Sequence, residues 1–163
     1  MKATLKYNDQ EIEVDISEEE IEKLRVKETI YDVDWQPGHG QQYWTASSYG
    51  YIHAHTFEND STDYLAYELG NFYPTREAIQ HALEVKKAEM RIKRAATLKN
   101  PDWGDGEQRK YIIYYDYQRD ILYTIYDFYV SNKAIAYYAT LQDAEKAIKE
   151  QEEDYLLVFG IKK

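Results

Sequence analysis

The chain has 163 residues, of which 44% are apolar and 31% are charged, the balance of one small folded domain rather than of a disordered chain. It contains no cysteine, which excludes disulfides, thiolate metal sites and cysteine nucleophiles. The formal net charge of -10 disfavours nucleic acid as a ligand; it suits a basic partner, or it simply keeps the protein in solution.

Membrane and export signals are not evident. No apolar run approaches the roughly 20 residues of a membrane span, and the first residues lack the apolar core of a signal peptide. We therefore expect no membrane association and a cytoplasmic location, which the lack of cysteine also fits.

Tyrosine is abundant and occurs 18 times. It either covers half-buried sheet faces or offers rigid contact area to a partner.

The N-terminal segment, 1–30, predicts a hairpin and a short helix. Residues 4–7 and 12–16 alternate apolar and polar side chains around a stretch of turn-forming residues. A serine then lies three residues before a glutamate, the spacing of a capping box, which predicts a helix over about 18–26. We assign the remainder, 31–163, to one α+β domain.

The first half of that domain, 43–98, predicts a hairpin, a loop and a long helix. Gly50 can take the positive φ that a hairpin turn requires. The polar and acidic stretch 58–68 is expected to be a loop with one brief ordered segment. Thr75 is the expected N-cap of a helix from about 76 to 98, where apolar residues recur at helical spacing.

The second half, 110–159, follows a similar order. Residues 111–117 and 121–128 predict two hairpin strands that are apolar on both faces, so we expect this pair at the centre of a sheet. A third strand is expected over 133–138 and a short helix over about 141–150. An acidic run and a final apolar segment close the chain.

The two halves predict an internal repeat. A shift of about 65 residues lays Thr75 on Thr140 and the aromatic pair 72–73 on 137–138. Two such units could pair their hairpins and cover one face with both helices. The expected fold class is therefore α+β, with antiparallel sheets built from hairpins, one long and two short helices, and an internal ββ(β)α repeat.

Catalytic and metal-binding patterns are not found in the sequence. His53 and His55 share one face of a predicted strand and could place two imidazoles together, but no third ligand has a defined spacing. The alternative is a surface strip of histidine and aromatic residues. No stretch has the residue types and spacing of a catalytic or phosphate site. We therefore predict no catalytic residue, no metal, no cofactor and no enzymatic activity.

Charged and aromatic side chains remain as candidates for contact with a partner. The acidic candidates are Glu58, Asp60, Asp63, Glu152, Glu153 and Asp154. The aromatic candidates are Tyr49, Tyr51, Tyr115 and Tyr117. A basic stripe on the long helix consists of Lys86, Lys87, Arg91, Lys93 and Arg94. This stripe could bind phosphate backbones, or it could pair with acidic neighbours in the same chain or in a second subunit.

Several structural motifs carry a resemblance over most of the chain. They are the opening run Ile16 to Glu20, the Ser48-Tyr49-Gly50 hairpin with Gly70-Asn71-Phe72 after it, the threonine-capped basic helix, and the ending from Glu145 to Ile148. Together they resemble small accessory proteins encoded by phages and prophages of Gram-positive bacteria. The resemblance implies a phage or mobile-element protein in the host-cell cytoplasm. Small acidic proteins of this class include inhibitors of bacterial immunity, among them anti-CRISPR proteins.

The leading hypothesis is a phage-encoded binding protein that inhibits a host defence nuclease, with a Cas nuclease as the expected partner. Carboxylates spaced like phosphates would occlude a basic nucleic-acid groove, and tyrosines would anchor the contact. One alternative is a nucleic-acid-binding accessory protein that uses the basic helix, 86–99. Another is a sponge for nucleotide signals. The basic helix face could also form the contact of a homodimer.

Overall fold

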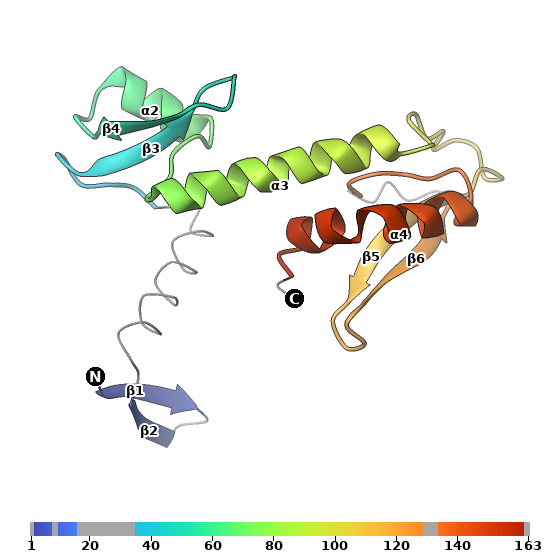
Figure 1. Cartoon of the computed structure of the whole chain (residues 1–163), viewed down its shortest axis with the longest axis horizontal. Helices are drawn as coiled ribbons and strands as arrows, with labels where there is room; N and C mark the ends of the chain where they lie inside the picture. The colour runs from blue at the N-terminus through green and yellow to red at the C-terminus, as the bar shows by residue number, and fades with distance from the viewer. Residues whose placement is uncertain (1, 8–9, 16–34, 129–133, 162–163) are drawn as a thin grey trace. The chain divides into compact units, whose positions relative to one another are not determined.

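The protein has an α+β fold, as predicted (Figure 1). A computed structural model describes residues 2–7, 10–15, 35–128 and 134–161, and for the first two ranges it describes the backbone alone. The elements are β1 (Lys2–Tyr7), β2 (Gln10–Asp15), β3 (Gln42–Ala46), β4 (Ile52–Thr56), α2 (Ser61–Glu68), α3 (Arg76–Ala95), β5 (Lys110–Asp116), β6 (Ile121–Asp127) and α4 (Leu141–Val158). The chain divides into two compact units, Met1–Ala82 and Leu83–Lys163, with the boundary inside α3.

The described strands form three antiparallel hairpins, β1–β2, β3–β4 and β5–β6. All three hairpins were predicted. The helix predicted over 18–26 lies outside the described residues. The prediction that β5 and β6 occupy the centre of a larger sheet is wrong for the described residues, where this sheet has two strands. The third strand predicted over 133–138 is reduced there to an isolated bridge, in which Tyr138 pairs with Tyr111.

The hairpin β3–β4 has a turn whose geometry follows from one glycine. The Gly50 amide donates to the Ser47 carbonyl (2.9 Å), and the Ser47 amide donates to the Tyr51 carbonyl (2.8 Å). Gly50 has φ +82°, a left-handed conformation that glycine adopts without strain. A tight turn closed by a glycine in this conformation is a common three-residue hairpin loop. The Ser47 hydroxyl also accepts from the Tyr51 amide (3.1 Å), which fixes the turn further.

The helix α2 corrects the prediction of a loop over 58–68. Asp60 is its N-cap, and its carboxylate accepts from the backbone amides of Thr62 and Asp63. In turn, the Asp63 carboxylate accepts from the Asp60 amide, which completes a capping box. This helix could not be predicted from the sequence, because its large apolar residues do not recur at helical spacing on one face.

The core of the first unit is a cluster of aromatic rings. Tyr43 on β3 is buried and stacks on Phe72, with ring centroids 4.1 Å apart, and it meets the edge of Phe57. Trp44 and Tyr73 exchange two backbone hydrogen bonds (2.9 and 3.0 Å). Beside that bridge, the side-chain amide of Asn71 bonds both the amide and the carbonyl of Ala46 (2.8 Å each), as a neighbouring strand would.

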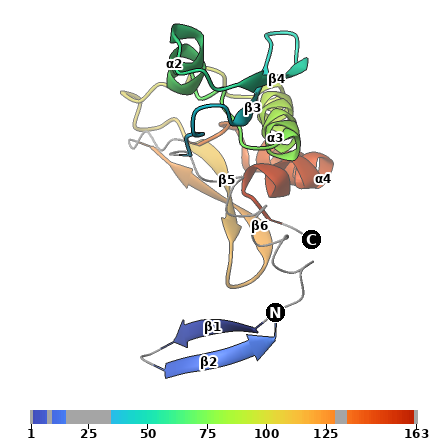
Figure 2. The ribbon, with the colours of Figure 1, turned by 90° about the vertical axis from the view of Figure 1, so that its left-hand side faces the viewer.

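The core of the second unit joins the β5–β6 hairpin to α4 and the end of α3. The helix α4 packs against both strands of the hairpin and runs across them in Figure 1; Figure 2 shows the same unit from the side. The buried cluster contains Ile92, Ala96, Ile113, Ala136, Tyr138, Ala144, Ala147 and Tyr155. Inside it, the hydroxyls of Tyr138 and Tyr155 share a hydrogen bond of 2.7 Å. This bond satisfies two polar groups that burial would otherwise leave without partners.

The helix α4 is longer than predicted. It runs through the acidic segment to Val158, with one residue of non-helical backbone at Gln151 (φ -132°, ψ 26°). Tyr155 and Leu156, expected in a separate apolar segment, are buried on its last turns. Burial of these two side chains holds the second part of the helix against the core, so tertiary packing overrides the local break.

The two units share one local arrangement. In each, a tyrosine bridges the first strand of the hairpin, and a threonine two residues later caps a helix. The Thr75 hydroxyl accepts from the Ala78 amide and the Thr140 hydroxyl accepts from the Asp143 amide, both at 3.1 Å. The internal repeat of the two halves stays a prediction.

Burial on α3 generates a stability prediction. Ile92 is fully buried in the second core, so Ile92→Ala should lower the free energy of unfolding by about 2–5 kcal/mol. Met90 on the same helix is 42% exposed, and Met90→Ala should change it by less than about 0.5 kcal/mol. Urea denaturation measures both, and equal effects would contradict this packing.

Candidate protein-interaction surface

The turn between β3 and β4 presents two tyrosines to solvent. Tyr49 is 87% exposed and Tyr51 is 68% exposed. Both flank Gly50 in the turn that Ser47 closes. The turn backbone is therefore fixed while the rings project from it, which is the arrangement of a preorganised contact site. Both residues were predicted as contact residues, and their exposure is compatible with that role.

The second hairpin places its two candidate tyrosines differently. Tyr117 lies in the β5–β6 turn and is 73% exposed. Tyr115 is buried, and its hydroxyl donates to the Asp120 carboxylate. That hydrogen bond, with burial, raises the pKa of Tyr115 to about 12. The prediction that Tyr115 contacts a partner is therefore wrong, because alternation along β5 turns it toward the unit's own interior.

The acidic candidates of the first unit also separate into exposed and buried groups. Glu58 and Asp60 are exposed in the loop between β4 and α2. Asp63 is 3% exposed, so its prediction as a contact residue is wrong. Its carboxylate instead accepts from the Tyr43 hydroxyl (2.6 Å) and from the backbone amides of Glu58 (2.8 Å) and Asp60 (3.2 Å). Asp63 thereby ties the start of α2 to the core of the unit.

The ionisation of Asp63 is coupled to this network. Burial opposes its charged form and by itself raises its pKa. The hydrogen bonds from Tyr43 and from backbone amides outweigh burial, so the pKa of Asp63 lies below its ordinary value. The pKa of the Tyr43 hydroxyl is raised above its ordinary value, mainly by burial and secondly by the hydrogen bond to the Asp63 carboxylate. The pair is therefore a neutral phenol bound to a carboxylate at neutral pH.

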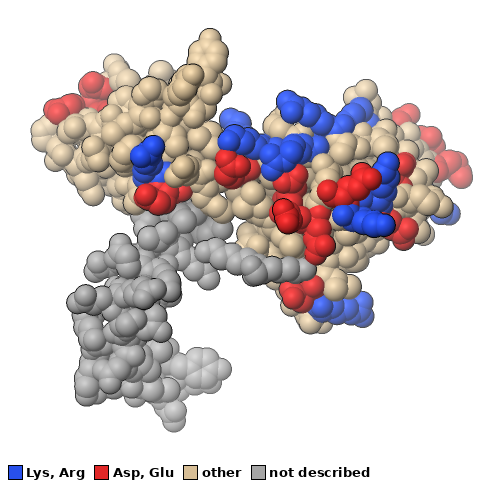
Figure 3. Space-filling view, viewed as in Figure 1, with Lys and Arg blue, Asp and Glu red and all other residues tan. Residues whose placement is uncertain are grey.

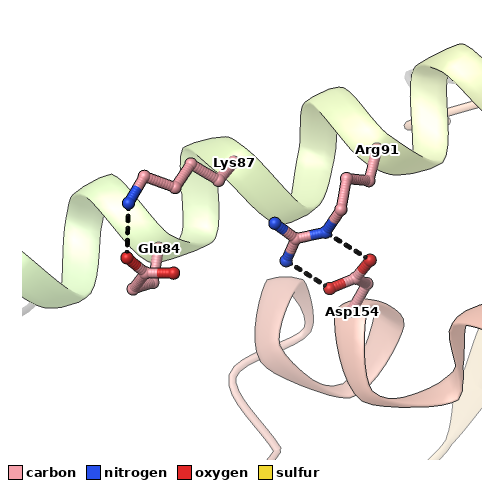
Figure 4. A network of polar contacts seen from close by, with 4 residues as sticks. All are labelled: Glu84, Lys87, Arg91 and Asp154. Atoms are coloured by element: carbon pink, nitrogen blue, oxygen red, sulfur yellow. Dashed lines mark hydrogen bonds and ion pairs between the residues drawn. The ribbon is translucent and has the colours of Figure 1, made fainter. Parts of the chain in front are cut away.

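The acidic run on α4 is partly used within its own unit. Glu152 and Glu153 are exposed. Asp154 accepts two hydrogen bonds from Arg91, from Nε (2.9 Å) and from Nη2 (2.6 Å), as Figure 4 shows. A two-point contact between guanidinium and carboxylate is geometrically specific. Asp154 is thus a partner of α3 and is a poor candidate for an external contact.

The basic stripe on α3 is largely neutralised in place. Besides Arg91, Lys87 pairs with Glu84 (2.7 Å), as Figure 4 shows. Lys93 pairs with Glu89 (3.3 Å). Among the residues that the structure describes, no ion pair reaches Lys86 or Arg94. Lys99, just beyond the helix, donates to the carbonyls of Lys93 and Arg94 and so caps its last turn. These pairs favour the interpretation of the stripe as a face paired with acidic neighbours over a phosphate-binding one.

Charge is unevenly distributed along the chain. No lysine or arginine occurs between Lys27 and Arg76, a stretch that includes β3, β4 and α2. On the face shown in Figure 3, the described surface of the first unit is mostly uncharged, whereas basic and acidic side chains intermingle over α3 and the second unit. The exposed tyrosines of the first unit therefore lie in a segment whose only formal charges are negative.

Four further exposed side chains were not predicted. They lie on or just after α2 and are Tyr64, Leu65, Tyr67 and Leu69. Tyr64 and Tyr67 pack the edges of their rings near Phe57 and Phe72, so they are anchored at one side. The exposure of these side chains could not be predicted, because the segment was expected to be a loop, and a loop has no regular face from which exposure can be inferred.

Metal and small-molecule sites find little support in this geometry. No group of three or more potential metal ligands occurs among the described residues. The His55 ring lies 3.0 Å from the Thr45 hydroxyl and stacks on Tyr43, so it belongs to the hairpin surface. A cleft of about 630 Å³ beside the N-terminus of α4 is lined by both Glu107 and Arg109. Arg109 is held there by the Tyr111 hydroxyl (3.4 Å) and the Tyr126 ring.

Comparison with known proteins gives no relative. Neither the protein-family models, nor the curated proteins, nor the solved structures contain a match to this chain. The resemblance to phage accessory proteins therefore stays a prediction. Within the described part of the chain, no helix is long and apolar enough to span a membrane.

The Asp63 network predicts how stability depends on pH. The pKa of Asp63 is lower in the folded protein than in the unfolded chain, so the ionised carboxylate stabilises the fold. This stabilisation is fully present at pH values above the unfolded-state pKa, and it is lost as pH falls through the folded-state pKa. Asp63→Asn should lower the free energy of unfolding at pH 7 by about 1–3 kcal/mol. The difference in free energy of unfolding between this variant and the native protein should become smaller below about pH 4.

Denaturation at pH 7 and pH 3 measures that difference. Glu58→Gln is the matched control, since its carboxylate is exposed on the same loop, and it should shift stability by less than about 0.5 kcal/mol. A difference of the same size at both pH values would contradict the proposed role of the carboxylate.

Proposed function

We propose that this protein is a non-catalytic binding protein of a phage or prophage that inhibits a nucleic-acid-binding defence effector of its bacterial host, such as a Cas nuclease. The observation that carries the proposal is the pair Tyr49 and Tyr51, which are largely exposed on a turn fixed by Ser47 and Gly50. Tyrosine supplies a large contact area and a polar tip, and it loses little entropy on binding.

The turn favours binding because its backbone is ordered before any partner arrives. Three hydrogen bonds across the turn, two of them backbone to backbone, restrict Ser47 to Tyr51. Ordering a loop on binding costs free energy, so a loop that is already ordered leaves more of the contact energy for affinity. Aromatic anchors on such loops dominate many interfaces, while the surrounding contacts exclude water.

The charge distribution supports a basic partner. A net charge of -10 attracts cationic grooves and raises the rate of encounter at low salt. Close to the tyrosine turn in sequence, the exposed carboxylates of Glu58 and Asp60 have no lysine or arginine within the segment 28–75. A groove that binds nucleic acid is rich in such cations, and carboxylates can occupy the positions of phosphates in it.

The main rival is a nucleic-acid-binding protein that uses the basic stripe. Arg91, Lys87 and Lys93 already hold carboxylates, and releasing them would cost those contacts. Each exposed pair is worth little alone, so it is the loss of free positive potential that disfavours this rival. The homodimer through this stripe is disfavoured on the same grounds.

Loss of inhibition tests the tyrosine anchors. We expect Tyr49→Ala/Tyr51→Ala to weaken binding to the partner about 10–100-fold, because both ring contacts are lost. Tyr49→Phe/Tyr51→Phe keeps the rings and should retain most of the affinity, and Met90→Ala should retain all of it. The variants are compared for inhibition of target cleavage by guide-loaded Cas nucleases of Gram-positive bacteria, and for phage plating on a CRISPR-immune strain.

Two further readouts of that experiment separate mimicry from other modes of inhibition. Binding should weaken as salt rises and should compete with target DNA, because both ligands use the same cations. Inhibition that is insensitive to salt and leaves DNA bound would rule out occlusion of the groove. Absence of inhibition with every nuclease, together with unchanged phage plating, would overturn the proposed function.

An electrophoretic shift assay tests the rival. With single- and double-stranded DNA or RNA at low salt, we expect no retarded band, because three of the five stripe residues hold carboxylates and the chain is acidic. A band that Lys86→Glu/Arg94→Glu abolishes would support the rival instead, since these are the stripe residues without an ion pair in the described chain. Glu145→Gln, remote from the stripe in sequence, is the control.

A further inference from the structure

The free edge of strand β6 follows from the hydrogen bonds on the other side of its hairpin. Tyr111 and Tyr138 exchange two backbone hydrogen bonds (3.0 and 2.8 Å), so the amide and carbonyl of Tyr111 point away from β6. The pair Tyr111–Tyr126 is therefore a non-hydrogen-bonded pair of the ladder. By alternation, the backbone groups of Leu122, Thr124 and Tyr126 point outward, away from β5.

These outward backbone groups are unpaired within the described residues. Outside the β5–β6 ladder, no backbone hydrogen bond to Leu122, Thr124 or Tyr126 is found there. Such a row of amides and carbonyls is a template for another strand. Natural edge strands block pairing with proline, lysine, bulges or short length, but β6 has seven residues, pairs in continuous register and carries no charge from Ile121 to Tyr126.

The side chains of β6 add an apolar row to this edge. Ile113 and Leu122 pack with the α4 core, and residues directly opposite share a face, so the even-numbered residues of β6 face α4. Ile121, Tyr123 and Ile125 then share the other face, and all three are exposed. Contiguous exposed apolar side chains of this kind mark an interaction surface.

We propose that β6 pairs antiparallel with β6 of a second copy of this chain, with the two-fold axis at Thr124. This centre brings all three outward residues into hydrogen-bonded pairs, Thr124 with Thr124 and Leu122 with Tyr126 of the second copy. A centre at Leu122 or at Tyr126 would use fewer of them. About six backbone hydrogen bonds would join a four-stranded sheet from two hairpins, and such sheets are more stable than isolated hairpins.

Self-complementarity selects a second copy as the occupant. In this register Tyr123 lies opposite Ile125 of the second copy, so apolar side chains meet on the exposed face. Asp127, the strand's only charge, lies opposite Ile121 of the second copy, so the two carboxylates are not directly opposed. The two-fold contact uses the same edge on both copies, so the assembly closes at two chains.

The dimer is independent of the proposed function, and salt distinguishes them. Each copy carries a charge of -10, so screening by salt should strengthen the dimer, whereas it should weaken a complex with a basic groove.

Analytical ultracentrifugation of the full chain from micromolar to millimolar concentration should show one monomer–dimer equilibrium. Tyr123→Lys should weaken it about tenfold or more, since it places a charge in the apolar row. Met90→Lys, a change of similar exposure away from the strand, should leave it unchanged.

The register is tested by crosslinking, because the chain has no cysteine of its own. In the proposed pairing, positions 123 and 125 of opposite copies form a non-hydrogen-bonded pair with Cα atoms about 4.5 Å apart, within disulfide range. A mixture of Tyr123→Cys and Ile125→Cys should form a disulfide-linked dimer under mild oxidation, and neither variant alone should do so.

Circular dichroism first confirms that each variant is folded. A chain that stays monomeric at every concentration and salt would overturn the proposal and leave the edge to a strand of another protein. A dimer that Tyr123→Lys leaves intact, or crosslinks as strong with one variant as with the mixture, would also overturn it.

Discussion

The exchange of two backbone hydrogen bonds between a hairpin and the tyrosine that precedes its helix constrains most of this structure. Tyr73 holds Trp44 in the first unit, and Tyr138 holds Tyr111 in the second. Each bridge pairs one residue on the outer edge of a two-stranded sheet, and two residues later a threonine caps the next helix. It also decides which backbone groups of the opposite strand remain open, as at β6. One local contact thus fixes the helix start and the free edge together.

Much of the fold could be predicted because it depends on local signals. Gly50 marked its turn, and Thr75 and Thr140 marked their helix starts. Alternation marked the strands of the first hairpin, and apolar runs marked β5 and β6. The helix α2 could not be predicted, because its capping box uses two aspartates and its exposed leucines hide the helical period. The full length of α4 was missed because only packing of its last turns carries the helix past Gln151.

Tyrosine illustrates why contact residues are harder to predict than scaffold. Tyr49, Tyr51 and Tyr117 are exposed at turns, whereas Tyr115 and Tyr43 are buried with their hydroxyls bound to aspartates. The residue type is the same in both roles. What separates them is strand register and a hydrogen-bond partner, and neither can be read from composition. Asp63 was assigned to the surface for the same reason, since a carboxylate can cap a helix or face a partner.

Charge placement separates scaffold from contact surface more clearly than net charge does. In the second unit, the carboxylates of α3 and α4 meet cations of the same unit, as Arg91 and Asp154 do, so much of that charge is consumed internally. The segment 28–75 contains no lysine or arginine, and among the described residues no ion pair reaches Glu58 or Asp60. Rigid tyrosines and uncompensated negative charge therefore coincide in the first unit. The uncharged edge of β6 has neither feature and is suited to a contact governed by backbone pairing and apolar packing. Two surfaces of opposite physical character can then act without competing for the same partner.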